Sequence, residues 1–200
     1  WEEAKSKKMN IVDATCPLVH EIHREVKKLA EDGRKIIIIG DHGHDEVVAI
    51  ANQVKGSIII SSPEEALELR KMKKVGVVSQ STQMIENVQQ IVNILMEKVY
   101  DLHFVNTICY PTKRNHNEIK LLALENDVMI IIGSFTSANS KRLTELSLDR
   151  NSNSYQITCA EDLDRKWFAG KESVGISAGA STPDYLIEEV KLRIEEYTRK

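Results

Sequence analysis

The sequence predicts an α/β protein made of two small pseudo-repeated units, each built on a parallel sheet. One sequence motif occurs twice, in residues 10–20 and 104–111: a short β-branched run, a threonine, a cysteine, and then a helical pattern. The interval from the cysteine to the glycine that closes the next apolar run is 24 residues in both copies. A preserved interval of this kind indicates an internal repeat. Strands that alternate with helices through short connections favour parallel sheets with right-handed crossovers.

Length and composition fit two domains of ordinary size. The chain has 200 residues, of which 42% are hydrophobic and 28% are charged, so each half can bury a core of its own. The repeat places the boundary where its second copy begins. We therefore predict two lobes: residues 1–105, carrying Cys16, His44 and Glu46, and residues 106–200, carrying Cys109, Ser137, Asn139 and Ser181.

The first half reads as strands and helices in alternation. Residues 1–9 indicate the end of a helix or a linker. Apolar residues recur at helical spacing after Cys16, until Asp32 and Gly33 stop the pattern. Ser62 followed by Pro63 predicts a capped helix start. The predicted elements are a strand at 10–12, a helix at 17–31, strands at 36–39 and 57–61, a helix at 62–73, a strand at 77–78 and a helix at 85–100.

The second half repeats this order. Its predicted elements are a helix at 119–126, a strand at 128–132, a helix at 142–148, strands at 154–158 and 175–177, and a helix at 185–197. In sheets of this kind, ligands bind at the carboxyl ends of the strands. The unusual polar residues of both halves follow predicted strands, so we expect them at that edge.

Charge and hydropathy exclude several classes of partner. A net charge of −3 gives no attraction to nucleic acid or to an anionic membrane. No apolar run reaches the roughly 18 residues that a membrane helix needs, and no leader opens the chain, so we expect a cytoplasmic protein. The first residue is Trp1 rather than Met, which suggests that the chain lacks its natural beginning.

Cysteines are the first candidates for chemistry. Cys16 and Cys109 stand where a helix begins, and the positive end of the helix dipole favours a thiolate there. Such a thiolate could be a nucleophile or a metal ligand; the alternative is a small buried residue. Cys159 matches the helix-cap position of Ser62 in the repeat, which favours a structural role. Cys16, His20 and His23 lie on one helix face, so a zinc site is a further alternative.

Polar loops after the strands are the second candidates. His44 and Glu46 could bind an anion and move a proton, although a solvated loop histidine is the common alternative. The equivalent loop, residues 134–140, offers hydroxyls and an amide. Residues 79–82 and 179–182 each open a helix after a strand, where backbone N–H groups can receive phosphate oxygens or simply be capped. No Walker or dinucleotide-binding glycine pattern is present.

Taken together, these motifs resemble the LytB-type hydroxymethylbutenyl diphosphate reductase family. The resemblance covers nearly the whole chain in the right order. It is carried by six motifs: residues 13–19 (DATCPLV), 43–47 (GHDEV), 79–82 (SQST), 106–110 (NTICY), 137–140 (SANS) and 178–184 (AGASTPD).

The resemblance implies two of the three lobes of a protein that holds a 4Fe-4S cluster through three cysteines, one from each lobe. Cys16 and Cys109 match two of these ligands. The third would belong to an amino-terminal lobe upstream of Trp1, together with a histidine that binds diphosphate. Cys159 matches no ligand motif. The fourth iron would bind the hydroxyl oxygen of the substrate.

The same resemblance implies roles for the polar loops. Glu46 would supply protons, with help from the hydroxyl of Ser81 or Thr82. Ser81 replaces the usual threonine and keeps the hydroxyl, whereas Ala138 replaces a serine and leaves only its backbone amide. The implied diphosphate-binding residues are His44, Ser81, Thr82, Ser137, Ala138, Asn139 and Ser181.

The implied activity is the last step of the methylerythritol phosphate route to isoprenoids. Hydroxymethylbutenyl diphosphate would be reduced to isopentenyl and dimethylallyl diphosphates, with ferredoxin or flavodoxin as electron donor. The fragment alone would be inactive, because it holds two of three cluster ligands. Two other classes remain open: a non-redox diphosphate-binding module and a hydrolase with a cysteine nucleophile.

Overall fold

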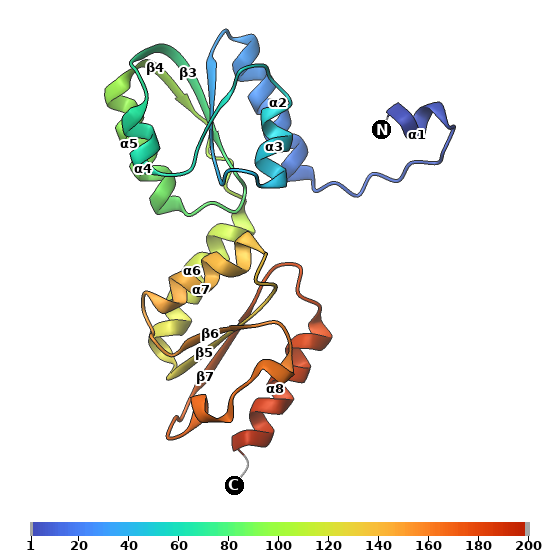
Figure 1. The fold of residues 1–200 in the computed structure, drawn as a ribbon, viewed down its shortest axis with the longest axis vertical. Helices are drawn as coiled ribbons and strands as arrows, with labels where there is room; N and C mark the ends of the chain where they lie inside the picture. The colour runs from blue at the N-terminus through green and yellow to red at the C-terminus, as the bar shows by residue number, and fades with distance from the viewer. Residues whose placement is uncertain (1, 199–200) are drawn as a thin grey trace. The chain divides into compact units, whose positions relative to one another are not determined.

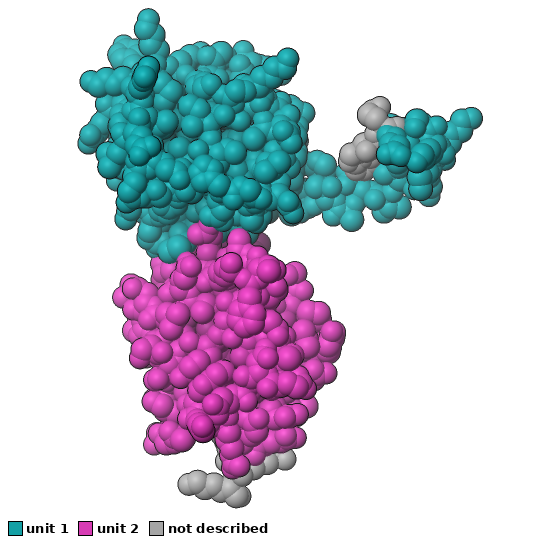
Figure 2. All heavy atoms as spheres, viewed as in Figure 1, with its two compact units in different colours: residues 1–107 teal, residues 108–200 magenta. Residues whose placement is uncertain are grey.

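The computed structural model describes residues 2–198. The chain forms two compact units, residues 1–107 (unit 1) and residues 108–200 (unit 2), which Figure 2 shows in different colours. The division falls after Thr107, two residues beyond the predicted lobe boundary. Both units are layered α/β structures with parallel sheets (Figure 1), so the predicted fold class is confirmed.

Unit 1 contains a four-stranded parallel sheet in the order β2-β1-β3-β4. Figure 1 shows α2 and α3 on one side of this sheet and α4 and α5 on the other. The elements of unit 1 are α1 (Glu2–Ser6), α2 (Pro17–Glu31), β1 (Lys35–Ile39), α3 (Asp45–Ala51), β2 (Ile58–Ile60), α4 (Pro63–Glu68), β3 (Met72–Ser79), α5 (Ile85–Lys98) and β4 (Val99–Phe104).

The core on one side of the unit 1 sheet is formed by α2, α3 and the strands β1 and β3. Gly76 in β3 lets α2 come close, since a Cβ there would lie 2.9 Å from the Cβ of Leu29. Burial of branched side chains at such a contact supplies most of the stability of a short helix. The buried cluster on this side of the sheet consists of Ile22, Val26, Leu29, Ile36, Ile38, Val47, Ile50 and Val78.

Unit 2 repeats the pattern with a three-stranded parallel sheet in the order β6-β5-β7. β5 is buried along its whole length, as expected for the central strand of a sheet covered on both faces. The elements of unit 2 are α6 (Tyr110–Glu125), β5 (Val128–Ile132), α7 (Ala138–Leu148), β6 (Ser154–Ile157), the 3-10 turns η1 (Ala160–Asp162) and η2 (Arg165–Phe168), β7 (Val174–Ala178) and α8 (Asp184–Thr198).

The predicted strand at residues 10–12 is wrong. These residues have no regular secondary structure, and Val12 is 85% exposed. A β-branched run forms a strand only when a neighbouring strand accepts its backbone hydrogen bonds, and the described chain places none beside it. In the second copy, by contrast, β4 precedes Cys109 and pairs with β3 from Met72 to Val77.

Two predicted helices are too long. The helix predicted at 62–73 ends at Glu68, and the helix predicted at 85–100 ends at Lys98. β3 begins at Met72 and β4 begins at Val99, and these two residues pair at the first register position. This pairing joins segments that are distant in sequence, so local helical spacing could not reveal it.

Candidate active site

Polar side chains of unit 1 lie at the carboxyl ends of β1 and β3. Gly40 follows β1 and lies against α3, where a Cβ would come within 2.5 Å of the Val47 side chain. His44 is the N-cap of α3, and its Nδ1 accepts a hydrogen bond from the backbone N–H of Glu46 at 3.2 Å. The cap therefore holds the predicted imidazole and carboxylate beside each other at the start of one helix.

Glu46 is bound to the loop that follows β3. Its Oε1 accepts a hydrogen bond from the backbone N–H of Ser81 at 2.7 Å, and its Oε2 accepts one from the Ser81 hydroxyl at 2.8 Å. Hydrogen bonds to a carboxylate are shorter and stronger than those between neutral groups. The structure thus brings together His44, Glu46 and Ser81, three of the residues that the sequence singled out.

A buried glutamine ties the two loops to each other. Gln80 is fully buried; its Oε1 accepts from the N–H of Asp41 at 2.9 Å, and its Nε2 donates to the Thr82 hydroxyl at 3.0 Å. Gln83 is also fully buried and donates to Asp41 Oδ1 at 3.2 Å. Sequence analysis assigned no role to either glutamine. The sequence indicates them only weakly, as two amide side chains that come soon after a predicted buried strand.

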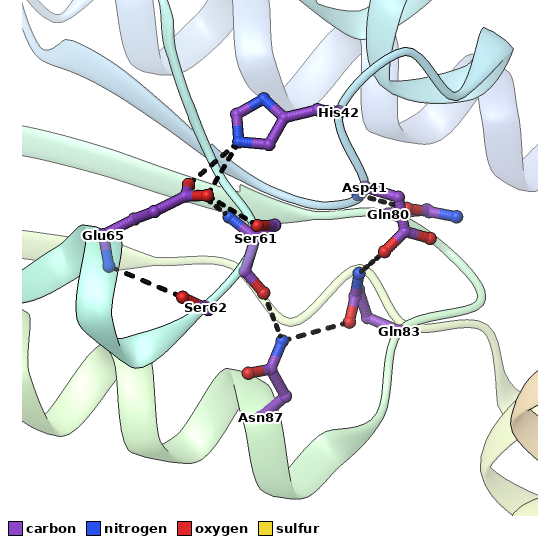
Figure 3. Close-up of polar contacts among 8 residues, drawn as sticks. All are labelled: Asp41, His42, Ser61, Ser62, Glu65, Gln80, Gln83 and Asn87. Carbon is purple, nitrogen blue, oxygen red and sulfur yellow. Dashed lines mark hydrogen bonds and ion pairs between the residues drawn. The ribbon is translucent and has the colours of Figure 1, made fainter. Parts of the chain in front are cut away.

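Figure 3 shows how this network extends to α4 and α5. Glu65 accepts hydrogen bonds from the N–H and hydroxyl of Ser61, and His42 Nε2 lies 2.9 Å from its Oε2. Burial alone would raise the pKa of Glu65, but the bonds from His42 and Ser61 outweigh burial and lower this pKa. Asn87 donates to Ser61 O at 3.0 Å and to Gln83 Oε1 at 3.3 Å. The loop between β1 and α3 is therefore held on one side by the loop after β3 and on the other by α4.

Cys16 is an exposed thiol at the start of α2. It is the N-cap residue, and within the described chain its side chain makes no capping hydrogen bond. Asp13 accepts from the Thr15 N–H at 2.9 Å and lies 3.3 Å from His20 Nε2. Residues 2–198 contain no group of three His, Cys, Asp or Glu side chains that could hold a metal. The alternative of a zinc site made by Cys16, His20 and His23 therefore gains no support.

Cys109 is the equivalent residue of unit 2. It is half-buried at the N-cap of α6, and its Sγ accepts a hydrogen bond from the Thr112 N–H at 3.4 Å. The chain just before it is fixed as well, because Ser79 N–H donates to the Thr107 hydroxyl at 2.8 Å. Both cysteines thus begin helices, as the repeat predicts. That the two cysteines bind one 4Fe-4S cluster stays a prediction.

In unit 2, the predicted anion-binding residues gather at the carboxyl ends of β5 and β7. Ser137 caps α7 by accepting from the Ser140 N–H at 3.3 Å. The Nδ2 of Asn139 is buried and has no hydrogen-bond partner in the described part of the protein. A Cβ on Gly179 would lie 3.9 Å from this nitrogen and 2.6 Å from Ser140 Oγ, so the 179–182 loop runs against the start of α7. Ser181 in this loop is exposed.

Cys159 serves as a cap rather than as part of this site. It is the N-cap of η1, which confirms the helix-cap position that the repeat predicted. Its N–H donates to Asp162 Oδ2 at 3.3 Å, and the Thr158 N–H donates to the same oxygen at 2.7 Å. These contacts fix the turn after β6.

The family model and the similar proteins all point to the same family. The family model described as LytB protein matches residues 1–195. The chain is 44% identical over 200 residues to the 4-hydroxy-3-methylbut-2-enyl diphosphate reductase of Geobacter sulfurreducens, covering 100% of the chain and 71% of that protein. The enzyme of the same name from Aquifex aeolicus is 40% identical over 200 residues, covering 98% of the chain and 69% of that protein.

Solved structures agree with the sequence comparison. A structure of (E)-4-hydroxy-3-methyl-but-2-enyl diphosphate reductase matches 98% of the chain and 71% of its own length, with 39% identity and a TM-score of 0.63. The Plasmodium falciparum reductase matches 99% of the chain and 63% of its own length, with 28% identity and a TM-score of 0.88. Within residues 2–198, no helix has the length and apolar character that crossing a bilayer requires. The chain therefore belongs to the LytB protein family of oxidoreductases.

Proposed function

We propose that the complete gene product containing this chain reduces hydroxymethylbutenyl diphosphate to isopentenyl and dimethylallyl diphosphates. The observation that carries the proposal is Glu46, held by Ser81 through both carboxylate oxygens and placed beside His44 at the carboxyl ends of β1 and β3. The relatives named above are reductases of this substrate. Replacing an allylic hydroxyl by hydrogen consumes two electrons and two protons, so a site with a positioned carboxyl group suits the reaction.

The two helix-capping cysteines fit a 4Fe-4S cluster. Cys16 is exposed and makes no capping bond in the described chain, and Cys109 is half-buried, so both are free thiols at helix N-termini. Thiolates are the usual ligands of such clusters, and a helix N-terminus favours the thiolate form. When bound, the cluster supplies electrons and a Lewis-acidic iron. We propose a third ligand outside this chain, and ferredoxin or flavodoxin as electron donor.

Glu46 would deliver protons in this reaction. The backbone N–H and the hydroxyl of Ser81 each donate to one oxygen of the Glu46 carboxylate, which fixes the orientation of this group. The Thr82 hydroxyl accepts from Gln80, so its own hydrogen remains for donation. The loops after β1 and β3 therefore hold a carboxyl group and a hydroxyl donor at one edge of the sheet.

The resemblance names the residues that would bind the diphosphate, and each of them offers a donor within its own unit. His44 is fixed by its cap bond, and Asn139 offers a buried amide nitrogen that has no partner in the described chain. A buried donor left unbonded costs free energy, which an anionic oxygen would recover. Ser137 and Ser181 contribute hydroxyls, and Ala138 contributes only the N–H of the first turn of α7.

Cysteine variants of the complete gene product test the cofactor. After anaerobic purification, we expect the wild type to be brown and to contain about four iron atoms per chain. Cys16→Ser and Cys109→Ser should each lose most of this iron and absorbance. Cys159→Ser is the matched control, because Cys159 caps η1, and it should keep both. A colourless wild-type protein after reconstitution with iron and sulfide would instead favour a non-redox diphosphate-binding module.

Glu46→Gln tests the proton delivery separately. The amide keeps the shape of the side chain but cannot carry the proton, so we expect the cluster to remain and turnover to fall by about a hundredfold or more. Turnover would be followed with a chemically reduced dye as electron donor. Unchanged turnover with an intact cluster would remove Glu46 from the mechanism.

A further inference from the structure

The two helix-capping cysteines differ in what lies against their sulfur atoms. Cys109 Sγ accepts a hydrogen bond from the Thr112 N–H at 3.4 Å, and it lies 2.8 Å from the hydroxyl oxygen of the same threonine. Cys16, in the equivalent position of unit 1, makes no capping bond within the described chain. The residue three positions after the cysteine is Thr112 in unit 2 and Val19 in unit 1. The second copy of the repeat thus gives its cysteine a hydroxyl partner that the first copy lacks.

Thr112 is fixed in place by the packing of α6. It is 5% exposed and lies with His116 and Ile119 on the buried face of the helix. A β-branched side chain in a helix has few rotamers, so burial and branching together keep the hydroxyl beside the sulfur. Val19 is half-buried, and its N–H donates to the backbone oxygen of Cys16 rather than to its sulfur.

Binding of iron settles which atom of the Cys109–Thr112 contact is the donor. The sulfur of a cysteine that binds a cluster is a thiolate and carries no hydrogen, so the Thr112 hydroxyl must donate to it. The Thr112 N–H donates to the same sulfur. Cys109 would therefore bind the cluster through a sulfur that receives two hydrogen bonds from one residue.

Hydrogen bonds to sulfur are one of the means by which a protein sets the reduction potential of an iron-sulfur cluster. Uptake of one electron from the donor protein adds negative charge to the thiolate sulfurs, while no covalent bond forms or breaks. An N–H or O–H donor stabilises the more negative, reduced form more strongly than the oxidised form. We propose that Thr112 is a positioning residue that raises the reduction potential of the cluster through Cys109, an inference that rests on the proposed reductase function.

A raised potential matters because the proposed reaction takes its electrons from another protein. Each turnover needs two electrons, which reach the cluster one at a time. A tenfold change in the equilibrium constant for one-electron transfer corresponds to about 59 mV. When donor and cluster have similar potentials, a shift of this size changes how much of the cluster the donor can reduce. The Thr112 hydroxyl would therefore favour electron uptake without touching the substrate.

Potentiometric titration of the complete, anaerobically purified gene product tests the inference without relying on turnover. The reduced cluster is followed by EPR and the oxidised cluster by visible absorbance. Thr112→Val removes the hydroxyl but keeps the shape and the N–H, so we expect an about tenfold smaller equilibrium constant for reduction, a fall of about 59 mV in the midpoint. Thr112→Ser keeps the hydroxyl and should stay close to wild type. A Thr112→Val midpoint equal to that of wild type overturns the inference.

Thr144→Val is the matched control. Thr144 is a half-buried threonine of α7 in the same unit, and its hydroxyl donates to Ser140 O at 2.9 Å rather than to a sulfur. Its midpoint should equal that of wild type, and a fall as large as that of Thr112→Val overturns the inference. Iron content is measured for each variant first. If Thr112→Val does not retain iron, Thr112→Ala, which also lacks the hydroxyl, is titrated in its place.

Turnover with two electron donors separates the inference from the proposed function. The loss of rate in Thr112→Val should be larger with reduced flavodoxin than with a strongly reducing dye, and an equal loss with both donors overturns the inference. A brown, active wild type with an unshifted Thr112→Val midpoint leaves the reductase function standing and removes only the inference. A wild type that stays colourless after reconstitution with iron and sulfide removes the proposed function and the inference with it.

Discussion

At the scale of single residues, the carboxylate of Glu46 depends on Ser81 for its orientation. Ser81 uses both its backbone N–H and its hydroxyl as donors, so the two oxygens of Glu46 are held by one residue. Removing the hydroxyl leaves the N–H bond in place. The effect on catalysis should therefore be intermediate between the wild type and the loss of the carboxyl group.

The first prediction concerns this hydroxyl. Ser81→Ala should lower kcat about tenfold, which corresponds to the loss of roughly 1.4 kcal/mol from one hydrogen bond to a charged group. Ser81→Thr keeps the hydroxyl and should stay within about twofold of wild type. Steady-state turnover of the complete gene product measures both. Equal rates for the alanine and threonine variants would show that the hydroxyl does not contribute.

The sequence could predict His44, Glu46 and Ser81 because each lies in a short loop directly after a strand, where ligands of parallel sheets bind. It could not predict Gln80 and Gln83 as anchors. Their partner Asp41 is some forty residues away in the chain, and glutamine is far more often exposed than fully buried. Buried amides of this kind become visible only when the fold brings their partners together.

At the scale of elements, each unit contains an equivalent clamp, a carboxyl group that fixes the turn after β2 in unit 1 and after β6 in unit 2. Glu65 accepts the N–H and hydroxyl of Ser61, and Asp162 accepts the N–H and hydroxyl of Thr158. The carboxyl group stands four residues after the hydroxyl in both cases. The bonds from Thr158 lower the pKa of Asp162, and the bonds from His42 and Ser61 lower that of Glu65 against the effect of burial.

The second prediction concerns the pH dependence of this clamp. A lowered pKa means that the folded state binds the Glu65 proton less tightly than the unfolded state, so the carboxylate stabilises the fold above pH 4.5, the ordinary value of a glutamate. Its contribution is lost as pH falls through the lowered, folded-state pKa. Glu65→Gln should therefore reduce the free energy of unfolding at pH 7, and this reduction should shrink as the pH falls below about 4.5.

Urea unfolding at a series of pH values measures this difference. Glu68→Gln is the matched control, because Glu68 is an exposed glutamate of the same helix, and it should show a small difference at every pH. A Glu65→Gln deficit of the same size at pH 7 and at pH 3 would contradict the clamp.

Element boundaries were predicted well where the signal was local and poorly where it was not. Ser62 and Pro63 marked the start of α4 correctly, since an N-cap acts within one turn. The end of α4 and the start of β3 depend on pairing between Met72 and Val99, which lies beyond any local pattern. The run at 10–12 has strand-forming residues but no strand beside it in the described chain.

At the scale of the whole molecule, each unit has its own buried core. The cluster of unit 1 includes Ile38, and the cluster of unit 2 includes Ile130. Trp167 belongs to unit 2 and stacks on Tyr155 with ring centroids 4.0 Å apart. With Trp1→Phe as background, Trp167 is the only tryptophan of the 200-residue sequence, so its fluorescence reports on unit 2.

The third prediction is that the units respond separately to mutations in their cores. Ile130→Val should lower the stability seen by Trp167 fluorescence by about 0.5 to 1.5 kcal/mol. Ile38→Val should leave that fluorescence transition in place and shift only the part of the circular dichroism change that belongs to unit 1. A shift of the fluorescence transition by both variants would show that the two cores unfold as one.

The order of strands in each sheet has a consequence for synthesis on the ribosome. β1 lies between β2 and β3, and β5 lies between β6 and β7, so β1 and β5 are each made before either of their neighbours. The run of buried isoleucines in each of them is exposed on the nascent chain until both partners have been translated, and such runs pair readily with other chains. Slow translation between Ile39 and Ser79, or between Ile132 and Ala178, would lengthen the period in which a chaperone must shield them.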